Sequence, residues 1–456
     1  MLGPRPNKQG GSRRSCPSRE GITRRGATRN SQVSWLRVPP RRPRDPGSPA
    51  RGLRSSRCCR AQKMAEAPET EGLVERPSSS GSTNGAPVDG PGGSRARTHG
   101  PRPSPDDGDV VVTPSKRNPD GRFVNPWSTW RKPDKKQALK WMLTEEDFSK
   151  VPAAEELQRT LPVHKPYFVE GAGGSGGGSP PESVRVTWLG HACVLVELEG
   201  FSFLTDPVFS ERASPVGFAG PRRYRPAPCT VAQLPEGLDA VLISHNHYDH
   251  LDHNSVVQLN RRYGTRLSWF VPLGLAGWMQ DTGCENVHEL DWWSERSAGL
   301  RSNITVAFTP AQHWCKRGAF DDNKVLWGSW CVLGTGARFY FAGDTGYCDV
   351  FQQIGRRYGP FTLAAIPIGA YAPSWFMSSQ HVDPEAAVKI HVDVRAGYSV
   401  GIHWGTFSLA NEFYLEPPQK LAEALSAGGH KPDVFFVLQH GETRDVGSGG
   451  CRPFPR

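Results

Sequence analysis

Four side chains of the kinds that bind metal ions lie within six positions: His245, His247, Asp249 and His250. They follow the apolar run 241–243, which is short, β-branched and typical of a buried strand. Neutral imidazole and carboxylate are ligands that zinc and similar metals prefer. The alternative is a polar loop that happens to be rich in histidine, but packing gives no reason for such a set. The spacing therefore predicts a metal-binding loop at a strand end, where alternate side chains can converge on two neighbouring points.

Three more candidate ligands each follow a predicted strand. His313 comes after 305–309, Asp344 after 338–342, and His403 after 399–402. Taken singly, each is typical of a cap or a satisfied surface group. Together with the 245–250 loop they make seven ligand-type residues, about the number that two zinc ions need when they share one carboxylate. Iron or manganese are alternatives to zinc at such a site.

Strand and helix patterns alternate along the rest of the chain. The pattern predicts helices over 137–143, 153–161, 254–263, 385–391 and 420–427. It predicts strands over 184–197, 201–204, 241–244, 269–271, 287–290, 305–309, 324–332, 338–342, 363–368, 399–403 and 434–438. Many strands with interspersed helices in both halves favour an α+β fold in which two sheets pack together and helices lie outside. The chain has no G-x-x-x-x-G-K-[ST] loop, so nucleotide-driven chemistry has no support from that motif.

Composition divides the chain of 456 residues into three regions. Residues 1–118 are basic and then rich in Pro, Gly and Ser, which predicts a disordered extension. Residues 119–444 are predicted to fold as the hydrolase domain, with a flexible stretch at 171–181, and 445–456 as a flexible tail. The basic segment 1–63 is interpreted either as an arm or targeting segment, or as preceding a working start at Met64; the change in composition favours the second.

The net charge of +10 is concentrated at the beginning of the chain. Residues 1–63 hold 15 Arg and 2 Lys against two acidic residues, a charge of +15, which leaves −5 for 64–456. A mildly acidic folding region argues against a nucleic-acid partner. The ten cysteines are scattered without a C-x-x-C pair, and no signal peptide is recognised, so reduced thiols are expected. No apolar run approaches the ~20 residues that span a bilayer, so any membrane contact is predicted to be peripheral.

The stretch HNHYDH (245–250) resembles the H-x-H-x-D-H signature of the metallo-β-lactamase superfamily, and His313, Asp344 and His403 follow in that family's order. The resemblance implies a four-layer αββα sandwich with two zinc ions per chain at one edge. It assigns His245, His247 and His313 to the first ion, Asp249, His250 and His403 to the second, and Asp344 to both. His191 and His440 are similar to residues that support the ligands, and neither is interpreted as a ligand.

Longer stretches resemble one branch, the N-acyl-phosphatidylethanolamine-hydrolysing phospholipase D family, from about residue 120 to 443. They include GRFVNPW (121–127), LTDPVFS (204–210), ELDWW (289–293), QHWCKR (312–317), LWGSW (326–330), FAGDTGYC (341–348), QHVDPE (380–385) and IHWGTF (402–407). The resemblance implies a zinc-dependent phosphodiesterase of the class EC 3.1.4. Such an enzyme hydrolyses N-acyl-phosphatidylethanolamines to N-acylethanolamines and phosphatidic acid at a membrane surface.

The same resemblance implies roles for individual residues. Asp249 and Asp344 would act with a zinc-bound hydroxide, and Gln380, His381, Lys316, Arg317 and Trp278 would contact the substrate. Trp278 belongs to the apolar run 270–279, which is interpreted either as a membrane-facing or tunnel-lining element or as ordinary core. Cys315 is expected to be a packing residue.

The family also implies a homodimer on the cytosolic face of internal membranes such as Golgi and endosome, and a bile-acid effector near Lys316 and Arg317. Gly318-Ala319-Phe320 departs from the larger apolar residues usual there, which weighs against bile-acid affinity. Two alternatives stay open: a soluble metallo-hydrolase of the same fold that acts on another phosphodiester, a lactone or a thioester, and a non-catalytic lipid-binding protein. The presence of every candidate ligand argues against the second.

Overall fold

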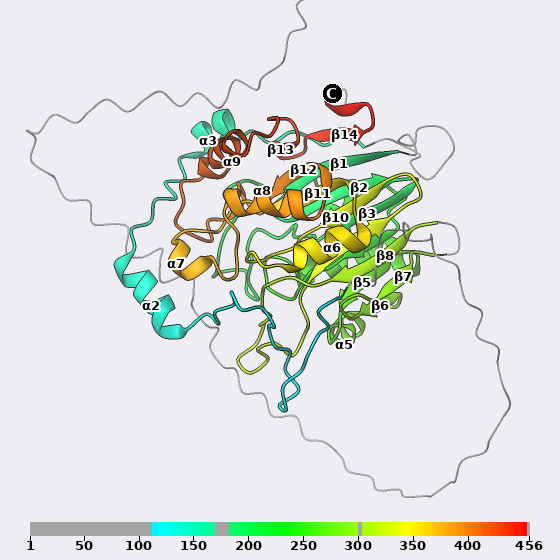
Figure 1. Ribbon diagram of the computed structural model, residues 1–456, viewed down its shortest axis with the longest axis horizontal. Coiled ribbons are helices and arrows are strands. Elements are labelled where there is room, and N and C mark those ends of the chain that lie inside the picture. Colours follow the sequence, from blue (N-terminus) through cyan, green and yellow to red (C-terminus); the bar gives the residue numbers. More distant parts are fainter. Residues whose placement is uncertain (1–110, 169–181, 300–302, 454–456) are drawn as a thin grey trace, which may run out of the picture. The chain divides into compact units, whose positions relative to one another are not determined.

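A computed structural model describes residues 111–168, 182–299 and 303–453, all of which belong to one unit of the chain. Within these ranges the strands form two sheets (Figure 1). The first has the order β15-β14-β1-β2-β3-β4-β5-β6 and the second β13-β12-β11-β10-β9-β8-β7. Most of the predicted extension (1–110) and the 171–181 stretch lie outside the described residues.

The bounds of the first sheet's strands are β1 Ser183–Gly190, β2 Cys193–Leu198, β3 Phe201–Thr205, β4 Ala240–Leu242, β5 Ser268–Pro272, β6 Val287–Leu290, β14 Thr443–Gly447 and β15 Gly450–Pro453. Those of the second are β7 Glu295–Ser297, β8 Thr305–Thr309, β9 Ser329–Leu333, β10 Arg338–Phe341, β11 Phe361–Pro367, β12 Ala396–Ile402 and β13 Phe435–Val437. The helices are α2 Lys135–Thr144, α3 Ala154–Thr160, α4 His253–Tyr263, α5 Ala276–Asp281, α6 Val350–Tyr358, α7 Ser374–Met377, α8 Pro384–Asp393 and α9 Glu416–Ala427.

The two sheets pack face to face through large aromatic side chains. Phe203 of β3 meets Phe339 of β10 with ring centroids 5.5 Å apart. Trp330 of β9 is fully buried, and its indole nitrogen donates to the carbonyl of Ile243 at 2.9 Å. Each such buried ring contributes on the order of 1.5–3 kcal/mol of transfer free energy. The hydrophobic core therefore lies between the sheets.

Helices cover the outer faces of the sheets. Helix α8 packs on β11 and β12, α6 and α9 flank it, and α5 packs on β6 (Figure 1). This arrangement confirms the predicted α+β sandwich of the metallo-β-lactamase type. Across the described ranges, no helix combines the length and apolar character needed to cross a bilayer.

Strand direction brings the candidate ligands to one edge. Strands β3, β4 and β5 run parallel, and so do β10, β11 and β12. Strand β8 pairs antiparallel with β9, which pairs antiparallel with β10, so β8 and β10 point the same way. The loops that leave the carboxyl ends of β8, β10 and β12 therefore start at the same edge of the second sheet.

The structure corrects three predictions about strands and boundaries. The strand expected over 184–197 is broken by a turn in which Gly190 and His191 both have positive φ, 102° and 53°. The strand expected over 324–332 begins only at Ser329, because the amides of Leu326 and Gly328 bond instead to the carbonyls of Leu273 and Ser244. The tail expected from 445 is not flexible up to 453: β14 pairs with β1, and β15 pairs with β14.

The first described residues lie earlier than the boundary expected at 118/119. The Thr113 carbonyl accepts a hydrogen bond from the Trp293 indole at 2.8 Å, and its amide donates to Gln353 Oε1 at 3.1 Å. Further along, Trp141 of α2 stacks on Phe376 of α7 with ring centroids 5.4 Å apart. Residues 111–168 thus pack onto the sandwich by both polar and aromatic contacts.

Candidate metal centre

The seven predicted ligands converge at the edge where the strands end. The loop after β4 carries His245, His247, Asp249 and His250, and Asp252 ends it by accepting a hydrogen bond from the Asn254 amide as the N-cap of α4. The remaining three, His313, Asp344 and His403, lie just after β8, β10 and β12. Five of the seven side chains are buried, whereas His247 and Asp249 are half-buried, with 16% of the Asp249 side chain exposed.

The first group consists of His245, His247 and His313. His247 Nδ1 lies 2.8 Å from His245 Nε2 and 3.2 Å from His313 Nε2. Burial lowers the pKa of all three, to about 4 for His247. Three neutral imidazoles that turn nitrogens toward one point offer the lone pairs that a divalent metal ion accepts.

The second group consists of Asp249, His250 and His403. His250 Nε2 lies 3.2 Å from His403 Nε2, and Asp249 Oδ2 lies 3.3 Å and 3.5 Å from these two nitrogens. Burial by itself would lower the pKa of His403, but Asp344 and a hydrogen bond with Asp249 raise it to about 9. The carboxylates thus favour positive charge at this point, as they would favour a bound cation.

Asp344 lies between the two groups. Its Oδ2 is 3.0 Å from His250 Nε2 and 3.8 Å from His313 Nε2, while its Oδ1 is 3.1 Å from His403 Nε2. Although burial opposes ionisation, His250 and His403 hold the pKa of this carboxyl well below its usual range. Nitrogen and carboxylate donors on both sides of one shared carboxylate fit a pair of divalent metal ions.

Each of three imidazoles is oriented by a bond at its outer nitrogen. His250 Nδ1 lies 2.6 Å from Asp206 Oδ2, and His313 Nδ1 lies 2.9 Å from the carbonyl oxygen of Gln380. His245 Nδ1 lies 2.8 Å from Ser244 Oγ, which donates in turn to Asp206. Such outer contacts fix the tautomer and the ring plane of a metal-binding histidine.

His191 and His440 lie behind the predicted ligands. His191 Nε2 is 3.0 Å from Asp249 Oδ2, and the turn between β1 and β2 brings the ring to the second group. His191 lies close enough to Asp249, His250 and His403 to be a fourth potential metal ligand in that group. His440 lies farther back, where its ring packs on Trp188 at 4.2 Å and its Nε2 meets Thr406 Oγ1 at 3.1 Å.

His381 and Gln380, two of the predicted substrate contacts, lie beside the centre. His381 Nδ1 is 3.8 Å from Asp344 Oδ2, and the ring stacks on His403. Burial lowers the pKa of His381 to about 4. Gln380 has a different environment, because its Oε1 accepts the indole hydrogen of Trp314 at 2.7 Å while its carbonyl holds His313.

The other three predicted substrate contacts, Arg317, Trp278 and Lys316, already contact other residues of the protein. Arg317 Nη1 donates to the carbonyls of Asn246 and Leu251 at 3.1 and 2.7 Å, so this guanidinium braces the predicted metal-binding loop. Trp278 is half-buried, 5.1 Å from that guanidinium. Lys316 forms an ion pair with Asp322 at 3.4 Å.

The apolar run 270–279 is mostly core. Phe270, Val271, Leu275 and Met279 are almost fully buried, so the membrane-facing interpretation holds for none of these four side chains. Cys315 is a packing residue as expected: it is fully buried and its thiol donates to the carbonyl of Leu326 at 3.4 Å.

Sequence reasoning missed two residues that support the ligands. Asp206 follows β3 within the stretch LTDP. Asp344 is predicted because it is an acidic residue that follows a predicted strand, and the same rule applied to β3 would find Asp206. Asn125 Nδ2 donates to the carbonyl of His313 at 2.7 Å, and no local pattern marks that contact because 188 residues separate the partners.

Comparison with known proteins finds relatives among hydrolases. The Beta-lactamase superfamily domain matches residues 202–404. The chain is 45% identical to N-acyl-phosphatidylethanolamine-hydrolyzing phospholipase D 1 of Caenorhabditis elegans over 328 residues, which is 69% of this chain and 89% of the relative. It is 39% identical to the mitochondrial enzyme of that name from Saccharomyces cerevisiae over 261 residues, 56% of this chain and 55% of the relative. A solved metallo hydrolase from Ignicoccus hospitalis aligns with a TM-score of 0.44 and 23% identity over 58% of this chain and 98% of that chain.

The fold and the histidine- and aspartate-rich edge are those of a metal-dependent hydrolase with the metallo-β-lactamase architecture. Within that class, the chain belongs to the N-acyl-phosphatidylethanolamine-hydrolysing phospholipase D family.

Proposed function

We propose that this protein is a dinuclear zinc phospholipase D that hydrolyses N-acyl-phosphatidylethanolamines to N-acylethanolamines and phosphatidic acid. The observation that carries the proposal is the shared carboxylate of Asp344 between two groups of ligand-type side chains, in a chain of this family. His245, His247 and His313 would hold one ion, and Asp249, His250 and His403 the other. When bound, the two ions would neutralise phosphate oxygens and make water acidic enough to supply the nucleophile near neutral pH.

The chain's own residues would position the reactants. Asp249 accepts a hydrogen bond from His191, and although burial opposes ionisation, His250 and His191 hold its pKa well below the usual range. Asp249 and Asp344 are therefore carboxylates at working pH and can accept a hydrogen bond from the attacking water. His381 lies near enough to Asp344 to contact the phosphate. In the reaction, the water oxygen forms a bond to phosphorus, the bond from phosphorus to the ethanolamide oxygen breaks, and that oxygen takes up a proton.

Substrate contacts by Gln380, Lys316, Arg317 and Trp278 belong to the proposal. Lys316 has 28% of its side chain exposed and is available to contact an anionic substrate group. For Gln380 and Arg317 the present bonds to Trp314 and to the 246–251 loop support an indirect role. These two residues would shape the site by holding His313 and the metal-binding loop.

The proposed substrate lies in a bilayer, so we also propose that the enzyme works peripherally at a membrane surface. Leu139, Leu143 and Trp375 are exposed on α2 and α7, and Lys140 lies 4.9 Å from the Trp375 ring. Exposed apolar and basic side chains together are suited to a lipid interface. A homodimer on internal membranes and a bile-acid effector remain predictions from the family resemblance.

The test is a paired assay of the full chain and its Asp344→Asn variant on vesicles that contain N-acyl-phosphatidylethanolamine, with bound zinc quantified. Wild type should release N-acylethanolamine and phosphatidic acid and hold about two zinc ions, and the variant should lose both properties. Asp239→Asn is the matched control, because this carboxylate accepts a hydrogen bond from the Ser202 amide at the start of β4, the end opposite the predicted metal ligands. Bound zinc without lipid cleavage would favour the soluble hydrolase that acts on another phosphodiester, lactone or thioester. Absence of bound metal would refute the catalytic account.

A further inference from the structure

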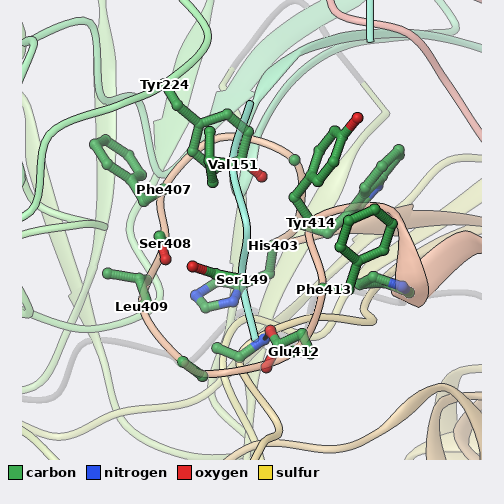
Figure 2. A pocket seen from close by; sticks show the side chains of 15 residues that line it. Ser149, Val151, Tyr224, His403, Phe407, Ser408, Leu409, Glu412, Phe413 and Tyr414 are labelled. Atoms are coloured by element: carbon green, nitrogen blue, oxygen red, sulfur yellow. Dashed lines mark hydrogen bonds between the residues drawn. The ribbon is translucent and has the colours of Figure 1, made fainter. Parts of the chain in front are cut away.

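A small cavity lies beside His403. Its volume is about 20 Å³, and its lining includes Ser149, Tyr224, His403, Ser408 and Glu412. Figure 2 shows the loop after β12 curving round this cavity, with the segment that carries Ser149 and Val151 crossing it. The crossing segment is bonded to the loop, since the Tyr414 amide donates to the Ser149 carbonyl at 3.1 Å. The cavity is thus lined mainly by the same loop that supplies a predicted metal ligand.

Two of the predicted histidine ligands, His247 and His403, have a buried outer nitrogen without a partner among the described residues. Nδ1 of His245, His250 and His313 each meets an oxygen at 2.6–2.9 Å. His403 Nδ1 is buried and has no partner among the described residues, while Nε2 of the same ring faces Asp344. A buried donor without a partner destabilises the folded protein. Histidines that bind metals almost always donate their outer N–H to a carboxylate, a carbonyl or water.

The cavity has room for the missing partner. A water molecule needs roughly 10–15 Å³ of such space and two to four polar neighbours. The volume beside His403 therefore suits one water molecule. His403 Nδ1 supplies a donor, and the hydroxyl and carboxylate groups of Tyr224, Ser408 and Glu412 supply the other polar neighbours.

Glu412 lines the cavity, and two backbone amides fix the position of its carboxyl group. Its Oε1 accepts the Ala370 amide at 2.6 Å, and its Oε2 accepts the Ala372 amide at 3.1 Å. A carboxylate offers about four lone-pair sites, so two backbone bonds leave capacity for another donor. Among the described residues no lysine or arginine forms an ion pair with this carboxylate, so it is not neutralised by a basic neighbour.

We propose that Glu412 is a positioning residue for the metal centre. One buried water in the cavity accepts the Nδ1–H of His403 and donates to Glu412, which fixes the ring and leaves the Nε2 lone pair directed at the second metal position. The backbone of His403 is already held, because its amide donates to the His191 carbonyl at 3.0 Å. The water and Glu412 complete the orientation at the ring itself. The proposal rests on the dinuclear centre of the proposed function.

The experiment compares Glu412→Gln with wild type in the full chain, loaded with cobalt(II) alone and free of lipid. The amide retains the size of the carboxyl group but is a weaker acceptor. We expect affinity for one of the two cobalt ions to fall about 10–100-fold, with an altered visible absorption spectrum. Glu416→Gln is the matched control: this nearby carboxylate accepts the Tyr371 hydroxyl at 2.8 Å and does not line the cavity. A merely structural role for Glu412 would lower the melting temperature and leave the cobalt spectrum of the folded variant unchanged, which would overturn the proposal.

A second measurement uses the wild-type protein and therefore tests the proposal even if Glu412→Gln does not fold. In a high-resolution crystal structure of the metal-loaded wild type, a water within hydrogen-bond distance of both His403 Nδ1 and Glu412 is expected. A cavity without that water would overturn the proposal and leave the proposed function intact. A wild-type chain that takes up no cobalt would instead remove the metal centre, and both proposals with it.

Discussion

The carboxylate of Asp206 provides the sharpest test of how this site is held. Asp206 is fully buried behind the second group of ligands. It accepts the Ser244 amide at 2.7 Å and the Ser244 hydroxyl at 2.5 Å, and it lies 2.6 Å from His250 Nδ1. Because both oxygens are used, Asp206→Asn must place an amide NH₂ next to one of these donors. The backbone amide of Ser244 can keep the remaining oxygen, so His250 is expected to lose its acceptor.

Loss of that acceptor changes which nitrogen of His250 carries the proton. With Nδ1 no longer bonded, the ring can hold its proton on Nε2, which is the nitrogen that faces Asp344. Removal of such a supporting contact costs about 10–100-fold in metal affinity, or about 1.4–2.7 kcal/mol. The buried polar mismatch adds about 1–3 kcal/mol of lost folding stability. Because domains are typically stable by about 5–15 kcal/mol, metal loss rather than unfolding should dominate.

The assay is zinc content per chain after dialysis against a graded series of chelator concentrations. We expect Asp206→Asn to lose one ion at a chelator concentration about 10–100-fold lower than wild type does, while the other ion is retained. Thermal unfolding of the chelated proteins reports the folding cost separately. Asp239→Asn, a carboxylate at the opposite end of β4, should behave like wild type. Retention of both ions by Asp206→Asn with wild-type affinity would refute the reasoning.

Three further predictions concern other contacts. Gly369→Ala places a Cβ 2.3 Å from the His403 carbonyl oxygen, so metal affinity and turnover should fall at least about tenfold while circular dichroism stays native. Asn125→Ala removes the bond to the His313 carbonyl at 2.7 Å and should lower the free energy of unfolding by about 1 kcal/mol in urea titrations, with zinc retained. Burial, and then the charge of His430, lower the pKa of His391 from 6.5 to about 4. Below pH 6.5 the unfolded chain protonates this histidine while the folded chain does not. The contribution of neutral His391 to the free energy of unfolding is therefore complete above pH 6.5. It should decline by up to about 3 kcal/mol, relative to His391→Gln, as the pH falls toward 4. An equal decline in the variant would contradict this assignment.

Some elements were predictable because a local pattern marks them. Helix α4 has apolar residues at helical spacing and Asp252 at its N-cap, and it forms at the predicted residues. Strand β7 has the sequence ERS, all three residues of which are exposed, and no apolar alternation marks it; it forms because it pairs with β8. Strands β14 and β15 likewise depend on β1, which lies more than 250 residues earlier in the chain. Sequence patterns report side-chain burial, whereas these strands exist because a distant partner supplies the hydrogen bonds.

The sequence by itself determined the chemistry of the site. Imidazoles and carboxylates at H-x-H-x-D-H spacing, with His313, Asp344 and His403 after later strands, define the donors and their order along the chain. These features are local, because donor type and strand-end position can be read from a few neighbouring residues.

Only the tertiary structure decided how those donors are shared and supported. It brings His313 within 3.2 Å of His247, puts Asp344 between the two groups, and sets Asp206 behind His250. It also turns Arg317 onto the carbonyls of the predicted metal-binding loop, where the sequence suggests a free substrate contact. The physical reason is that such contacts depend on strand direction, register and burial, which join residues far apart in the chain and leave no mark on the sequence around either one.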